Sequence, residues 1–177
     1  PFIILFLPNI WVNYILNNNN RVLPDMPFTG NQLGKKILEE QQIYDVNIEP
    51  IKQLDHYNPI KKKIHIGEDK LNKKSITSIA VVAHEIGHAI QDKENYKPLI
   101  MRQKLIEKTM IFQRLGSFLL IIGLPSIFAF TKSPLITFIA AMIIMGCLST
   151  NVLIHLITLP VEFDASFKRA LPILQKY

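Results

Sequence analysis

Two histidines and a glutamate in the stretch HEIGH, at His84, Glu85 and His88, have a spacing that can build a hydrolytic metal site. One helical turn takes 3.6 residues, so both imidazoles lie on one helix face and can reach the same Zn²⁺ ion. Glu85 is rotated about 100° from His84 and lies beside the metal, where its carboxylate can take a proton from an attacking water. Chance gives HExxH in a chain of this length on the order of half a per cent of the time, so we interpret the stretch as a zinc site.

A catalytic zinc ion takes three protein ligands and keeps one position open, so two histidines are not enough. No third histidine follows at short distance, and the chain's one cysteine, Cys147, lies in an apolar run. Glutamate on a second helix is the other known solution, and Glu162 stands where the chain returns from its apolar region. Asp164 is an alternative ligand. The competing interpretation of Glu162 is an ordinary carboxylate at the start of a helix that follows Pro160, where the helix dipole favours it.

Other side chains before the motif carry weaker signals. His56 and Tyr57, in the predicted turn DHYNP, are candidates for substrate or oxyanion contacts by residue type only. His65 on a predicted strand and His155 in an apolar run are interpreted as structural or solvated. The strand KKKIHI directly precedes the motif helix, and we hypothesise that residues 62–66 form an edge strand that pairs with an extended peptide.

The elements that must position these residues can be predicted from spacing. The motif helix is expected to begin after Ser75, a good N-cap, and to run through ITSIAVVAHEIGHAIQD without a breaker except Gly87. An earlier helix is expected after Thr29, because Leu33 and Ile37 recur at helical spacing. Two or three short strands lie between these helices, in YDVNIEPI and KKKIHIGED, with DHYNP as the turn before the second.

Two apolar stretches, residues 110–130 and 135–159, follow the motif and are joined by TKSP. At 1.5 Å per residue each can cross a hydrocarbon layer roughly 30 Å thick. Because the connection is so short, the two helices must form an antiparallel transmembrane hairpin. The predicted organisation is an N-terminal membrane anchor truncated at its start (1–16), a linker (17–27), a soluble zinc-binding part (28–109), the hairpin (110–159) and a C-terminally truncated third-ligand helix (160–177).

Composition and charge limit the classes of function that the chain can have. Apolar residues make up 49% and charged residues 19%, which fits alternating apolar and polar blocks, and the net charge is +6. The lysines are scattered among acids rather than clustered with aromatics, which argues against nucleic acid as a partner. Positive charge marks the cytoplasmic side, and basic residues near the ends of the hairpin outnumber Lys132 in its loop, so we expect the catalytic part on the cytoplasmic side.

The stretches DHYNP, SIAVVAHEIGHAIQ and LPVEFDAS, the last after two apolar helices, resemble the family of membrane-bound neutral zinc metallopeptidases (the zinc peptidase 2 group). The resemblance covers nearly the whole chain and implies further apolar helices beyond its last residue. It implies Zn²⁺ as cofactor, Glu85 as the catalytic residue, Glu162 as third ligand beside the two histidines, and a bacterial cell membrane as the location. The expected fold class is mainly α with a small antiparallel β-sheet (α+β), with a zincin-like HExxH helix and a transmembrane helical hairpin.

A more distant similarity connects the chain to gluzincin membrane proteases, which carry a later E-x-x-x-D. The sequence departs from that pattern, because Ser166 stands four residues after Glu162 and the acid is Asp164. A side chain two residues further along a helix points about 200° away around the axis. The usual carboxylate partner of a zinc-bound histidine is therefore missing from its place.

We therefore predict an integral membrane protein that acts as a zinc-dependent metalloendopeptidase, a hydrolase that cleaves peptide bonds with a zinc-activated water. Its partners would be a peptide or protein substrate and the lipid bilayer. One alternative is a non-proteolytic membrane protein that uses the same residues to sense or store zinc. The other is a structural membrane protein whose basic face binds anionic lipid.

Overall fold

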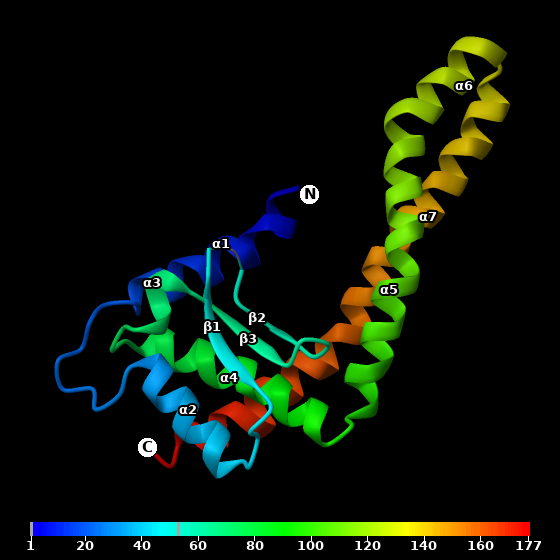
Figure 1. Cartoon of the computed structure of the whole chain (residues 1–177). Coiled ribbons are helices and arrows are strands. Elements are labelled where there is room, and N and C mark those ends of the chain that lie inside the picture. Colours follow the sequence, from blue (N-terminus) through cyan, green and yellow to red (C-terminus); the bar gives the residue numbers. More distant parts are fainter. Residues whose placement is uncertain (1, 53) are drawn as a thin grey trace. The chain divides into compact units, whose positions relative to one another are not determined.

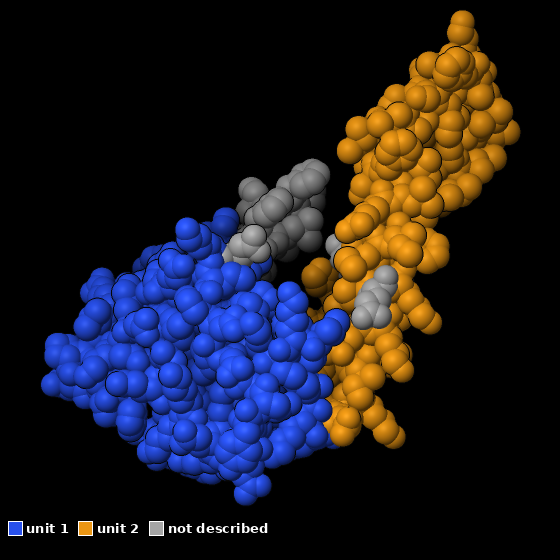
Figure 2. Space-filling model, in the orientation of Figure 1, with its two compact units in different colours: residues 1–94, 163–177 blue, residues 95–162 orange. Residues whose placement is uncertain are grey.

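The structure is a computed structural model that describes the backbone of residues 2–52 and 54–177. It describes the side chains of these residues except 2–9, 107, 148, 150, 151 and 153. Its contacts divide the chain into two units, shown in Figure 2: unit 1 holds residues 1–94 and 163–177, and unit 2 holds residues 95–162. Unit 1 is therefore built from two separate pieces of the chain.

A sheet of three short strands forms one layer of unit 1 (Figure 1). Strand β3 (Lys63–Gly67) lies in the middle, parallel to β1 (Asn47–Ile51) and antiparallel to β2 (His56–Asn58). The predicted class, mainly α with a small sheet, is confirmed, but the sheet is mixed and not antiparallel. DHYNP is also more than a turn, because it contains β2; the chain reverses just after it, where Lys62 adopts a left-handed conformation (φ 52°).

The central position of β3 contradicts the hypothesis that residues 62–66 form an edge strand. Both edges of β3 are already hydrogen-bonded, one to β1 and the other to β2. A peptide cannot add to a strand that has no unpaired edge. The outer edges of the described sheet belong to β1 and β2.

Two helices, α2 (Gly30–Glu40) and α4 (Ile76–Lys93), pack against one face of this sheet. Both predicted N-caps are confirmed. The side chain of Thr29 accepts a hydrogen bond from the backbone N–H of Gln32, whose side chain in turn accepts from the N–H of Thr29. The hydroxyl of Ser75 accepts the backbone N–H three residues further on at 3.1 Å.

The core of unit 1 lies between the sheet and these helices. Side-chain alternation along β3 buries its two isoleucines and turns His65 to the opposite face. Within unit 1, the largest apolar side chains that are at most 1% exposed come from α2, β3 and α4: Leu33, Ile37, Ile64, Ile66, Val82 and Ile86. Each such side chain stabilises the fold by about 1.5–3 kcal/mol. The motif helix is therefore fixed along one side by the core.

The N-terminal helix α1 (Phe2–Asn18) leads into a segment that is tied to the start of α4. Thr77 donates its hydroxyl to the carbonyl of Leu16 at 2.6 Å, and its backbone N–H bonds to the carbonyl of Asn19 at 3.3 Å. A short helix, α3 (Glu68–Leu71), joins β3 to α4. The predicted membrane anchor, 1–16, includes residues whose side chains the structure does not describe.

Unit 2 contains a helical hairpin (Figure 1). Its first arm is continuous from α5 (Lys97–Phe118) through the π-helix η1 (Leu119–Gly123) to α6 (Leu124–Thr131). The chain reverses at Lys132, which takes a left-handed conformation (φ 48°), and returns as α7 (Pro134–Phe163). The short connection therefore produces the antiparallel arms that the sequence predicts.

The apolar side chains of this hairpin are largely exposed. Phe130 and Ile121, for example, are 89% and 72% exposed. Among the described residues, one helical stretch, Lys97–Thr131, has the length and apolar composition needed to cross a membrane, and the described apolar part of α7, Pro134–Cys147, is shorter. The second predicted span, 135–159, includes residues whose side chains are not described.

The chain re-enters unit 1 through the π-helix η2 (Asp164–Ala170) and the short helix α8 (Leu171–Leu174). Contrary to prediction, no helix starts after Pro160, because α7 continues through it to Phe163. Pro172, the second residue of α8, lacks the N–H that would bond the carbonyl four residues earlier, so one hydrogen bond of a regular α-helix is missing where η2 meets α8.

Candidate metal centre

Helix α4 presents His84 and His88 on one face, as the spacing predicts. Their rings meet edge to face, with centroids 4.8 Å apart and an interplanar angle of 83°. His88 is 7% exposed and the intervening Glu85 is 6% exposed, so both lie in surroundings from which most water is removed. Polar groups that are buried to this degree need partners or a ligand.

The backbone of η2 crosses α4 directly at Gly87. A Cβ atom at this position would lie 2.6 Å from the carbonyl oxygen of Ala165 and 3.2 Å from its carbonyl carbon. Only a residue without a side chain permits an approach this close. Gly87 therefore lets the returning segment lie against the helix between its two motif histidines.

The residue just before the returning segment has a carboxylate side chain. Glu162 is the last residue of unit 2 and is bonded to Phe163, the first residue of the returning piece of unit 1. One possible ligand atom from each of His84, His88 and Glu162 lies within 4.8 Å of the others. Because Glu162 lies inside α7, it is not the helix-start carboxylate of the competing interpretation. Its Oε1 lies 3.2 Å from Nη1 of Arg102.

Both imidazoles are oriented by hydrogen bonds at Nδ1. His84 Nδ1 lies 2.9 Å from the hydroxyl of Ser166, and His88 Nδ1 lies 2.9 Å from Oε1 of Gln91. An amide oxygen only accepts, so His88 carries its proton on Nδ1 and has its lone pair on Nε2. This tautomer is the one that binds a metal through Nε2.

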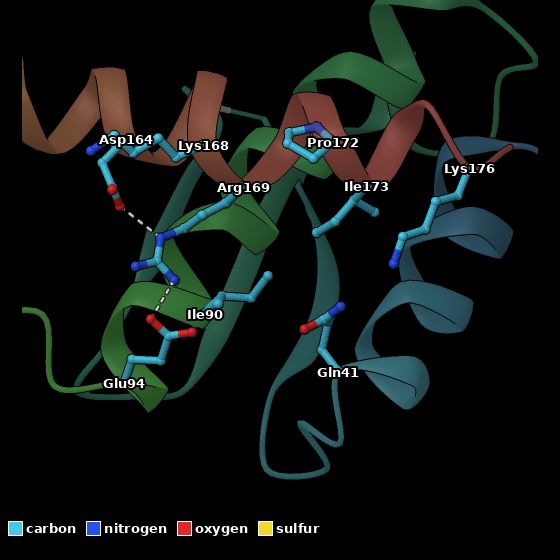
Figure 3. A pocket seen from close by; sticks show the side chains of 9 residues that line it. All are labelled: Gln41, Ile90, Glu94, Asp164, Lys168, Arg169, Pro172, Ile173 and Lys176. Carbon is cyan, nitrogen blue, oxygen red and sulfur yellow. Dashed lines mark hydrogen bonds and ion pairs between the residues drawn. The ribbon is translucent and has the colours of Figure 1, made fainter.

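Gln91 is held in turn by a buried ion pair. Its Nε2 donates to Oδ2 of Asp164 at 2.8 Å, and Arg169 Nε donates to the same oxygen at 2.7 Å. Arg169 also donates from Nη1 to Glu94, just past the end of α4, at 2.8 Å (Figure 3). We call the chain His88–Gln91–Asp164–Arg169–Glu94 the His88 relay.

Hydrogen bonds favour the ionised forms of Asp164 and Arg169. Burial alone would raise the pKa of Asp164, but hydrogen bonds from Arg169 and Gln91 outweigh it and hold the pKa below its ordinary value. The pKa of Arg169 is raised, because its bonds to Asp164 and Glu94 outweigh the effect of its own burial. Asp164 is 7% exposed and its carboxylate is directed to Gln91 and Arg169; it is not among the three residues that surround the candidate metal position.

The two candidates for oxyanion contacts lie elsewhere. The ring of His56 stacks on His65, with centroids 4.7 Å apart. The hydroxyl of Tyr57 donates to Asp92 at 2.7 Å, and burial together with this carboxylate raises the tyrosine pKa. Neither His56 nor Tyr57 lines the cavity that contains His84 and Glu85.

Sequence reasoning missed the side chains that orient the histidines. Ser166 stands four residues after Glu162, so the spacing of the gluzincin pattern marked the correct position, although a hydroxyl replaces the acid there. Gln91 lies three residues after His88, which is the helical spacing for neighbouring side chains. Nothing local to Arg169 indicates that it would meet Asp164 and Glu94.

An HExxH helix whose histidines lie beside a carboxylate from a later helix is the arrangement of zinc-dependent hydrolases. A sequence model described as "Putative neutral zinc metallopeptidase" matches residues 1–177, and the chain belongs to this family. It is also 30% identical to "Putative membrane protease YugP" of Bacillus subtilis (strain 168), over 164 residues that make up 89% of this chain and 69% of that protein. No solved structure matches the chain.

Proposed function

We propose that this protein is a membrane-embedded zinc metalloendopeptidase in which His84, His88 and Glu162 hold the metal. The observation that carries the proposal is the convergence of two imidazoles and a carboxylate within 4.8 Å. Two nitrogens and one oxygen are the donor set of catalytic zinc sites, and the tautomer of His88 fits it. These residues therefore fit a zinc ion.

When bound, zinc acidifies a water molecule and polarises the scissile carbonyl. Glu85 follows His84 directly on α4 and lies in the wall of the same cavity, which suits the role of general base. Its low exposure keeps bulk water from competing for the carboxylate. After it accepts the proton, Glu85 can pass it to the departing amine.

The orienting side chains have a separate role in this proposal. Ser166 fixes the plane of the His84 ring, and the His88 relay fixes both the plane and the tautomer of His88. A carboxylate bonded to a ligand imidazole raises its basicity. In this chain Asp164 raises the basicity of the His88 imidazole indirectly, through the amide of Gln91.

The membrane location is part of the proposal. It is supported by the exposed apolar surface of the hairpin, by the stretch Lys97–Thr131 and by the name of the Bacillus relative. We place the protein in a bacterial cell membrane with unit 1 on the cytoplasmic side, because the basic residues near the hairpin ends outnumber Lys132. Its substrate is a peptide or protein.

Glu85→Gln tests the proposal against a zinc sensor or store. The variant keeps the shape of the side chain and loses the base, so we expect wild-type zinc content and a loss of peptide hydrolysis of at least about 100-fold. Glu39→Gln, an exposed position on α2, is the matched control and should hydrolyse normally. Wild-type protein that holds stoichiometric zinc and cleaves no peptide in a diverse library would refute the peptidase and favour the sensor.

A further inference from the structure

A cavity of about 610 Å³ in unit 1 opens beside the motif. This size falls in the range of roughly 300–1,000 Å³ that is usual for ligand pockets. One wall is a strip of α4 in which Ala80 and Val81 precede His84 and Glu85 by one helical turn. The cavity therefore begins at the proposed catalytic residues and extends along the helix toward its N-terminus.

The facing walls are apolar. They come from the returning segment, from α1 and from the loop before β2: Phe167, Ala170, Leu171, Leu174, Val12, Leu16 and Leu54. Several of these side chains are unusually exposed for large apolar groups, with Leu54 at 85% and Phe167 at 60%. Large apolar side chains that converge on one cavity and stay in contact with water favour an apolar ligand.

The polar groups of the cavity are already engaged. Ser166 is bonded to His84, and Asp55 accepts the backbone N–H of Gly67 at 2.6 Å and pairs with Lys70. Neither side chain can therefore bind a polar group of a ligand without first losing a partner. The part of the cavity away from His84 and Glu85 thus selects by apolar contact.

We infer that this cavity receives large aliphatic or aromatic side chains of the peptide, next to the bond that is cleaved. This inference rests on the proposed function and adds the substrate class. We assign the occupant to the substrate because Glu85 and His84 share this cavity with the Ala80–Val81 strip, so side chains adjacent to a peptide bond held at Glu85 are within reach of the strip.

The inference is tested by cleavage of peptides that differ at a single position next to the scissile bond. The enzyme sample is the zinc-loaded full chain in detergent. The bond is first located by mass spectrometry in a mixed peptide library. We expect kcat/KM for Leu or Phe at that position to exceed that for Ala or Asp by roughly 10-fold or more. Ala80→Phe, which fills the cavity from an exposed position, should remove this preference and leave zinc content unchanged. Ile76→Phe, one turn earlier on α4 and outside the cavity, is the matched control.

A binding measurement separates failure of this inference from failure of the proposed function. Fluorescence anisotropy of a labelled Leu peptide on zinc-loaded Glu85→Gln protein needs no catalysis. Cleavage that is indifferent to the apolar residue and to Ala80→Phe would overturn the inference and leave the peptidase standing. Binding that Ala80→Phe weakens, without cleavage by the wild type, would uphold the cavity and refute the peptidase. If the protein neither binds nor cleaves the peptide, both the inference and the proposed function are overturned.

Discussion

Replacing Gly87 with alanine places a methyl group where the backbone of η2 crosses α4. The new carbon would lie 2.6 Å from the carbonyl oxygen of Ala165. A backbone carbonyl cannot rotate out of the way as a flexible side chain can, so the two segments must separate. We expect this separation to move Glu162 and Ser166 away from the motif histidines.

The magnitude combines two opposing terms. Alanine gains about 0.5–1 kcal/mol over glycine inside a helix, and overpacking costs about 1–3 kcal/mol. The net expectation is a loss of roughly 0–2.5 kcal/mol in the free energy of unfolding. Gly146→Ala is the matched control, because a Cβ at that position in α7 meets nothing within 4 Å. It gains the helix term alone, so the difference between the two variants, about 1–3 kcal/mol, isolates the contact.

Two measurements check this prediction. Denaturant unfolding of the metal-free variants in detergent gives the difference in stability. Competition with a chromophoric chelator gives the zinc affinity, which we expect Gly87→Ala to lower at least about 10-fold and Gly146→Ala to leave unchanged. If Gly87→Ala is as stable as Gly146→Ala and binds zinc like the wild type, the crossing does not position the third ligand.

Three further predictions concern the residues around the site and the sheet. Glu162→Gln should abolish stoichiometric zinc, whereas Asp164→Asn should keep it with affinity lowered no more than roughly 10–100-fold; metal analysis showing the reverse would exchange their roles. Ser166→Ala should lower zinc affinity by roughly 10–100-fold without changing the unfolding transition of the metal-free protein, as measured by circular dichroism. Burial, followed by repulsion from His56, lowers the pKa of His65, so the fold favours its neutral form. The stability that this provides is present above about pH 6.5 and is lost as pH falls through the folded-state pKa. The Tm of the metal-free wild type should therefore fall more between about pH 7.5 and 5 than that of His65→Gln, and parallel curves would contradict this.

The parts of the fold that were predicted correctly depend on spacing along one element. The helix after Ser75, its histidine face and the reversal at Lys132 follow from helical periodicity, capping and loop length, which act within a few residues. Glu162 was singled out by topology, because a hairpin that leaves and returns brings the next carboxylate back to the same side; that it binds a metal stays a prediction.

The parts that were missed depend on which elements meet. Strand β2 has three residues with turn-forming neighbours, so its hydrophobic pattern is too short to detect, and the central position of β3 follows from its pairing alone. The link from Gln91 to Asp164 exists only because η2 crosses α4 at Gly87. No local pattern in the sequence encodes that crossing.

The discontinuity of unit 1 has a consequence for the order in which the protein is made. The ribosome completes the HExxH helix first, but Glu162, Ser166 and Asp164 emerge only after the whole hairpin has been synthesised. At about 5–20 residues per second this interval lasts from several seconds to more than ten. During this time the nascent chain has the two motif histidines but not Glu162. The proposed metal site therefore cannot be complete until the apolar hairpin has left the ribosome.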